Sequence, residues 1–116
     1  MTGTEWLVDA RGCDPIRLRS QGTLAALFDR MCEELHLRPV EPALWHLFPG
    51  EGGITGLLLL AESHLTVHTF PETCLLTLNL YCCRPRPEWP FAERLAEMVG
   101  ASRVEVRTVL RGKEEQ

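Results

Sequence analysis

Three consecutive stretches between residues 54 and 83 carry the hydrophobic patterns of β-strands, and they constrain the fold more than any other feature of the chain. Residues 54–61 are almost continuously apolar, as expected of a buried strand. Residues 65–70 alternate, so that Leu65 and Val67 occupy one face while histidine and threonine side chains occupy the other. Residues 74–83 also alternate, after a short Pro-Glu-Thr turn. We therefore expect a β-sheet at the centre of the chain.

The flanking segments predict two helices and further strands. Thr23 is the expected N-cap of an amphipathic helix that ends near His36, before Pro39 prevents its continuation. Pro90 suits the first turn of a second helix, which Gly100 ends. Three more strands are expected at residues 5–10, 40–48 and 104–110. The order β-α-β-β-β-β-α-β predicts an α+β two-layer sandwich, with a mostly antiparallel sheet and both helices on one face. The other face is then solvated or covered by a second copy of the chain.

Composition excludes several classes of protein. The 116 residues suit a single domain, and 45% hydrophobic with 24% charged residues is typical of globular proteins. A net charge of −4 leaves no basic excess for binding nucleic acid. No apolar run is long enough to span a membrane, and the first residues lack a secretory signal pattern. Five cysteines without a C-x-x-C pair argue against disulfides and structural zinc, so we expect a cytoplasmic protein.

The densest polar stretch, residues 62–72, directly follows the apolar strand. Its ordinary interpretation is a strand that emerges into solvent, but polar groups beside a buried strand also line clefts. A Ser-His hydrolase is disfavoured because G-x-S-x-G is absent. A metal site would use His64 and His68, with Glu62 or Cys83 as the candidate third ligand. Backbone self-cleavage would use Ser63 against the preceding carbonyl. The residues alone leave these alternatives open.

The segment GGITGLLLLAESHLTVHTFPE resembles the processing region of bacterial and archaeal S-adenosylmethionine decarboxylase proenzymes. That family has a glycine-flanked apolar strand, then E-S-H, and H-T-W-P-E after three more residues. The opening EWLVDARGCD and the final FAERLAEMVGASRVEVRTVLRG also resemble the family's first strand and its last helix and strand. The resemblance therefore extends over most of the chain.

The resemblance implies autocatalytic cleavage between Glu62 and Ser63, which would leave chains 1–62 and 63–116 packed together. Ser63 would become a covalent pyruvoyl group, which forms a Schiff base with the substrate amine and accepts electrons as CO2 leaves. Cys83 matches the family's proton donor, and a free thiol is mostly protonated at neutral pH because its ordinary pKa is about 8.5. Alternation places the neighbouring Cys82 on the opposite side of the strand. Family membership also implies at least a homodimer, with sites that the two copies share.

Other positions follow from the same resemblance. His68 matches the family's processing histidine, which helps to break down the ester intermediate, and Thr55 stands where a serine commonly assists processing. Glu72 matches a glutamate expected to hold the ribose of the substrate. The aromatic rings of Phe48 and Phe70 are expected near the adenine, and the Asp9 carboxylate is expected to attract the sulfonium or another cation. No metal is expected.

The implied function is decarboxylation of S-adenosylmethionine for polyamine (spermidine) synthesis. Three positions depart from the family pattern, because Phe70 replaces a tryptophan, Asn79 an aspartate and Cys82 a threonine; the family's longer tail is also missing. Some relatives act instead on arginine or ornithine, and such substrates need carboxylates, for which Asp9, Glu51 and Glu72 are candidates. A further alternative is an unprocessed, non-enzymatic relative that acts as a binding or regulatory partner.

Overall fold

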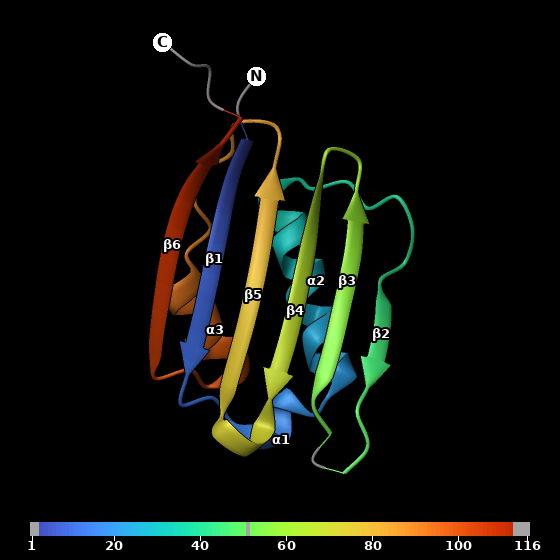
Figure 1. The fold of residues 1–116 in the computed structure, drawn as a ribbon, viewed down its shortest axis with the longest axis vertical. Helices are drawn as coiled ribbons and strands as arrows, with labels where there is room; N and C mark the ends of the chain where they lie inside the picture. Colours follow the sequence, from blue (N-terminus) through green and yellow to red (C-terminus); the bar gives the residue numbers. More distant parts are fainter. Residues whose placement is uncertain (1–2, 51, 113–116) are drawn as a thin grey trace.

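The computed structural model describes residues 3–50 and 52–112, which form one six-stranded sheet with helices on one face (Figure 1). Every pair of neighbouring strands is antiparallel, in the order β2-β3-β4-β5-β1-β6. The strands are β1 (Gly3–Arg11), β2 (Leu44–Leu47), β3 (Ile54–Leu60), β4 (Ser63–Phe70), β5 (Leu75–Cys82) and β6 (Arg103–Arg111). The helices are α1 (Pro15–Leu18), α2 (Gln21–Leu35) and α3 (Phe91–Val99), with a 3-10 turn η1 (Pro71–Thr73). The predicted α+β sandwich is confirmed.

The ends of several elements differ from the sequence-based prediction. Thr23 is not the N-cap of α2: the Ser20 side chain accepts a hydrogen bond from the Thr23 N–H, so the helix begins at Gln21. The strand expected over 40–48 is reduced to four residues, because Pro42 has no N–H to offer the sheet. The one-turn helix α1 was not predicted, although Asp14 caps it as an Asp-Pro sequence permits.

The core lies between the sheet and the helices. Alternate residues of each central strand are buried on this side, and α2 and α3 cover them with their apolar stripes. The helical contribution consists of Leu24, Leu27, Phe28, Met31 and Leu35 from α2 and of Phe91, Leu95 and Val99 from α3. Each such side chain stabilises the fold by roughly 1.5–3 kcal/mol when fully buried. We call the side of the sheet opposite the helices the open face.

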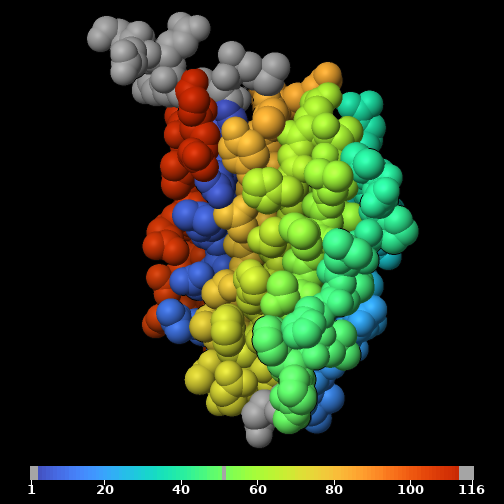
Figure 2. Space-filling model, turned by 45° about the vertical axis from the view of Figure 1, so that its right-hand side comes forward, coloured from blue at the N-terminus to red at the C-terminus, as the bar shows by residue number. Residues whose placement is uncertain are grey.

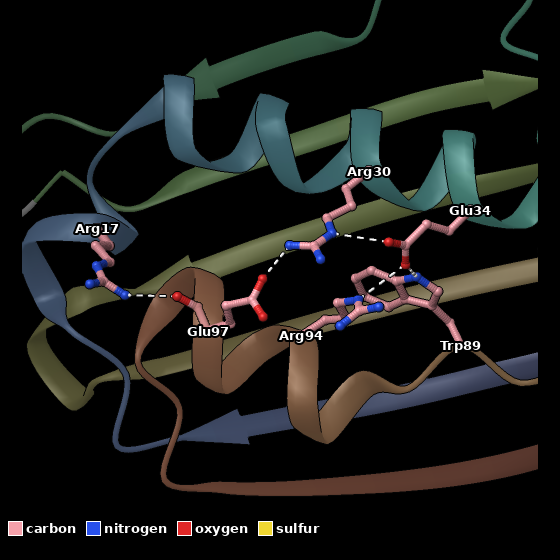
Figure 3. A network of polar contacts seen from close by, with 6 residues as sticks. All are labelled: Arg17, Arg30, Glu34, Trp89, Arg94 and Glu97. Carbon is pink, nitrogen blue, oxygen red and sulfur yellow. Dashed lines mark hydrogen bonds and ion pairs between the residues drawn. The ribbon is translucent and has the colours of Figure 1, made fainter.

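A polar network joins α2 to α3 and to the connection that precedes α3 (Figure 3). The Glu34 carboxylate accepts hydrogen bonds from the Trp89 indole at 2.7 Å and from the Arg94 and Arg30 guanidinium groups at 3.1 Å each. Arg30 also pairs with Glu97 on α3. These partners, with Arg94 first, lower the pKa of Glu34 to about 2. The network fixes the path of residues 83–90, which begins beside the start of β4.

Candidate active site

The Glu62–Ser63 peptide lies at the tight turn between β3 and β4. Residues 61 and 62 form the turn, and Ser63 is the first residue of β4, paired with Leu60 on one side and Cys82 on the other. Ser63 is only partly exposed, and its side chain lies next to the thiol of its register partner Cys82. Its hydroxyl is therefore positioned by the neighbouring strand, next to the peptide bond that precedes it.

The carbonyl group of Glu62 is held from the other side. Its oxygen accepts a hydrogen bond from the backbone N–H of Cys83, with an N···O distance of 3.2 Å. A fixed N–H donor stabilises negative charge that develops on a carbonyl oxygen during nucleophilic attack. The turn thus places a hydroxyl nucleophile beside a polarised carbonyl, which is the arrangement that backbone cleavage requires.

The two adjacent cysteines have different surroundings. Cys82 is 1% exposed and faces the helices, and burial raises the pKa of its thiol although the nearby Arg86 opposes this effect. Cys83 follows the end of β5 and is partly exposed. Its side chain lies beside Tyr81 on the open face, and this interaction is the main cause that raises the pKa of the tyrosine. Cys83 is therefore the more accessible thiol beside the turn.

A second group of predicted residues lies at the opposite end of β4. Thr55 and His68 are direct partners in the β3–β4 register, and the Thr55 hydroxyl lies 3.1 Å from Nδ1 of His68. Both line a cavity of about 400 Å³ whose walls also include Phe48, Phe70 and Glu72. The structure thus brings together two predicted processing residues and three predicted substrate-binding residues. The loop that contains Pro49, Gly52 and Gly53 completes the lining.

Asp9 does not join this cavity. It lies on the open face of β1, where its carboxylate is 4.0 Å from the guanidinium of Arg107, and it lines a separate shallow hollow with Asn79 and His68. Glu51, the other carboxylate considered for a basic substrate, lies outside the described residues. Asn79 donates to the Glu5 carboxylate at 2.7 Å, which is the main cause that lowers the pKa of Glu5. An aspartate at position 79 would instead place a second negative charge beside the Glu5 carboxylate.

Ser63 begins β4, whereas His68 lies near the other end of the same strand. They are five residues apart on one regular strand, a separation of about 16 Å at the usual rise per residue. The odd spacing also places them on opposite faces, and the alternating burial along β4 agrees with this assignment. A single chain therefore holds the Glu62–Ser63 peptide and the Thr55–His68 pair out of mutual reach.

Sequence reasoning overlooked three arginines beside Glu62. Arg38 contacts the Glu62 carboxylate at 3.2 Å, Arg84 forms an ion pair with it, and Arg86 lines the same small cavity as Ser63. The RPRP segment carried the only hint, because two cationic side chains flank a proline there.

No metal site is apparent in the part of the chain that the structure describes. Among residues 3–50 and 52–112, no three His, Cys, Asp or Glu side chains lie close enough together to hold an ion. His64 and His68 share the open face, as the alternation predicted. None of the helices within these ranges is both long and apolar enough to cross a membrane.

Comparison with known proteins identifies related sequences over nearly the whole chain. The family described as S-adenosylmethionine decarboxylase matches residues 4–112. An S-adenosylmethionine decarboxylase proenzyme of Picrophilus torridus is 33% identical over 72% of this chain and 63% of its own length. An arginine decarboxylase proenzyme of Ignicoccus hospitalis is 31% identical over 74% of this chain and 60% of its own length. An S-adenosylmethionine decarboxylase proenzyme of Clostridium botulinum is 27% identical over 97% of this chain and 96% of its own length.

The fold is also similar to a solved structure. The crystal structure of the adenosylmethionine decarboxylase from Aquifex aeolicus superimposes with a TM-score of 0.81. The match covers 98% of this chain and 93% of that protein, at 24% sequence identity. This similarity establishes the common fold.

Proposed function

Because the chain belongs to the S-adenosylmethionine decarboxylase family, we propose that it is a pyruvoyl-dependent decarboxylase that matures by cleaving its own Glu62–Ser63 bond. The observation that carries this proposal is the turn itself, where the Ser63 hydroxyl lies beside a carbonyl that the Cys83 N–H polarises. Cleavage there yields chains 1–62 and 63–116. The five cysteines are all free thiols, in keeping with the cytoplasm as the site of action.

Maturation requires a defined sequence of bond changes. The Ser63 oxygen adds to the Glu62 carbonyl carbon while the Cys83 N–H stabilises the oxyanion, and rupture of the C–N bond leaves an ester and a free amine. Loss of a proton from the Ser63 α-carbon then expels the Glu62 carboxylate, and hydrolysis of the resulting enamine releases ammonia and leaves a ketone. His68, aligned by the Thr55 hydroxyl, is the base that we assign to the elimination.

In the mature enzyme a pyruvoyl group supplies the electron sink for decarboxylation. The chain's own contribution is to bind the substrate, exclude water and return a proton to the substrate's α-carbon. We assign this proton to the thiol of Cys83, since it is partly exposed while Cys82 is buried among core residues. The contact with Tyr81 holds the donor on the open face.

The lining of the cavity around Thr55 and His68 favours S-adenosylmethionine as substrate, with its product consumed in spermidine synthesis. Phe48 and Phe70 offer aromatic surfaces for adenine, and Glu72 offers a carboxylate for the ribose hydroxyls. Glu72 is also the only acidic side chain among the described residues that line this cavity. Arginine or ornithine would need more carboxylates in this cavity to bind the distal cation. Arginine is the second candidate because the Ignicoccus relative is named an arginine decarboxylase proenzyme.

We further propose that two copies pack through their open faces and share their sites at the rim of the sheet, where the turn before β4 holds Ser63. The separation of Ser63 from His68 on one strand supports the assignment of this base to His68 of a partner chain. The open face also presents an apolar patch of Leu44, Leu57 and Leu59, which are 69%, 46% and 56% exposed. Figure 2, with the β2 edge turned forward, shows the side chains of β2, β3 and β4 adjoining on this surface. An apolar surface of this kind is typical of interfaces between copies.

The basic experiment compares the parent protein with Ser63→Ala. We expect the parent to yield two chains on a denaturing gel and to react with carbonyl reagents, whereas Ser63→Ala stays intact and unreactive. Release of labelled CO2 from carboxyl-labelled S-adenosylmethionine, arginine and ornithine then identifies the substrate. Cys83→Ala should retain cleavage but lose turnover, and the matched Cys82→Thr variant should keep both. An intact parent chain without a ketone would contradict the proposal and favour the non-enzymatic alternative.

A further inference from the structure

Three arginines surround the residue that precedes the proposed cleavage site. Arg38, from the connection between α2 and β2, lies 3.2 Å from one oxygen of the Glu62 carboxylate, and Arg84, from the connection between β5 and α3, pairs with the other. Arg86 follows two residues later and lines a small cavity with Arg38, Glu62 and Ser63. Two separate connections thus bring positive charge to one residue. We call Arg38, Arg84 and Arg86 the arginine cradle.

Arg86 has bonding capacity that the uncleaved chain does not use. One terminal nitrogen donates to the backbone oxygen of Leu35 at 2.6 Å, which anchors the guanidinium at the end of α2. Its guanidinium also interacts with the Cys82 thiol, which is a weak acceptor, whereas its buried Nε has no hydrogen-bond partner among residues 3–50 and 52–112. A buried charged N–H without an acceptor is unfavourable, and such groups are normally satisfied. The unused donor belongs to a side chain that lines the cavity beside the scissile peptide.

The charges at this point are unequal before cleavage. The cradle carries three positive charges, and the single carboxylate of Glu62 faces them. Cleavage would convert the Glu62 carbonyl into a second carboxylate on the same residue. Guanidinium groups are well suited to this product, because their forked donors bind carboxylates with two hydrogen bonds.

We propose that the arginine cradle is a binding site for the carboxylate that self-cleavage creates at Glu62, with Arg86 as its main ligand. This inference rests on the proposed function. Binding there holds the new end of the 1–62 chain against the β5–α3 connection, so that the cut end of β3 does not fray beside the substrate. The cradle residues are positioning residues, which act on the cut end without contacting the reacting carbon of the substrate.

The test compares the same substitution in cleaved and uncleaved protein. Arg86→Met is made in the self-cleaving parent and in Ser63→Ala, and the melting temperatures are measured at equal protein concentration, because the cleaved form has two chains. The hydrogen bond to the Leu35 oxygen is lost in both backgrounds, so its effect on the melting temperature cancels in the comparison. We expect the decrease in melting temperature to be roughly 5 °C larger in the cleaved background, since only there does a second carboxylate lose its partner. Arg86→Lys should restore part of this difference.

Two further variants complete the design. Arg103→Met removes an exposed arginine that pairs with Glu105 on β6, and should lower the melting temperature equally in both backgrounds. If Arg86→Met prevents folding or maturation, the double variant Arg38→Met, Arg84→Met takes its place, since both side chains are largely exposed. Equal effects in cleaved and uncleaved protein would refute the cradle and leave the proposed function standing. A parent chain that never cleaves would refute both.

Discussion

Mixing two inactive variants tests whether sites are shared between copies of the chain. One variant carries Ser63→Ala and lacks the nucleophile; the other carries His68→Ala and lacks the proposed elimination base. In the structure these positions are about 16 Å apart on one strand and face opposite sides. Neither variant alone should form the ketone.

The expected yield follows from the symmetry of a dimer. Random pairing of equal amounts of the two variants gives mixed dimers in roughly half of the cases. Each mixed dimer contains one site with Ser63 from one chain and His68 from the other, and one site that lacks both. Roughly one quarter of all chains should then acquire a carbonyl group, against nearly all chains of the parent.

Co-expression of differently tagged variants, followed by a carbonyl-specific hydrazine and intact-mass measurement, gives the fraction directly. The labelled fragment should be 63–116 from the His68→Ala chain. A mixture with no more ketone than the separate variants would show that Ser63 and His68 act within one chain, contrary to their separation on β4. If the His68→Ala protein alone reacts fully with the hydrazine, His68 is not needed for maturation.

Two other predictions concern stability, and both use the Ser63→Ala background so that a single chain unfolds. The buried Thr69 hydroxyl donates to the Leu18 oxygen at 2.8 Å and accepts from the Ile54 N–H at 2.9 Å. Thr69→Val leaves both groups unpaired and should cost about 2–5 kcal/mol by urea denaturation, and the argument fails if Thr69→Ser, which keeps the hydroxyl, costs as much. Glu34 has a pKa lowered to about 2, so its contribution to stability is present above its unfolded pKa of about 4.3 and is lost as the pH falls towards 2. Glu34→Gln should therefore be less stable than the background at pH 7 and nearly equal to it at pH 2, and a constant difference across this range would contradict the assignment.

The faces of the strands were predictable because they depend on local alternation. Leu65 and Val67 are buried as expected, and His68 lies on the opposite face. The start of α2 was not predictable, because Ser20 and Thr23 are both acceptable N-caps. Only the path of the preceding chain selects between them. A boundary of this kind depends on tertiary structure rather than on residue type.

The structure brings five of the predicted site residues together around one cavity, but the arrangement of the candidate site was not predictable. The spacing of five residues between Ser63 and His68 already implied opposite faces of the strand. The two residues belong to one short sequence motif, however, which suggests that they lie together. The arginine cradle was beyond sequence reasoning, because Arg38 and Arg84 reach Glu62 only through the packing of two irregular connections. Such connections follow paths set by the helices that they join, here through the network around Glu34.

The strand order has a consequence for any chain cut between β3 and β4. Residues 1–62 supply β1, which lies between β5 and β6, and both of these neighbours belong to residues 63–116. The two pieces therefore share one sheet. Removal of β1 would break its backbone hydrogen bonds to β5 and to β6 at the same time. Neither piece has a complete sheet of its own, so the severed protein should come apart only by unfolding as a whole.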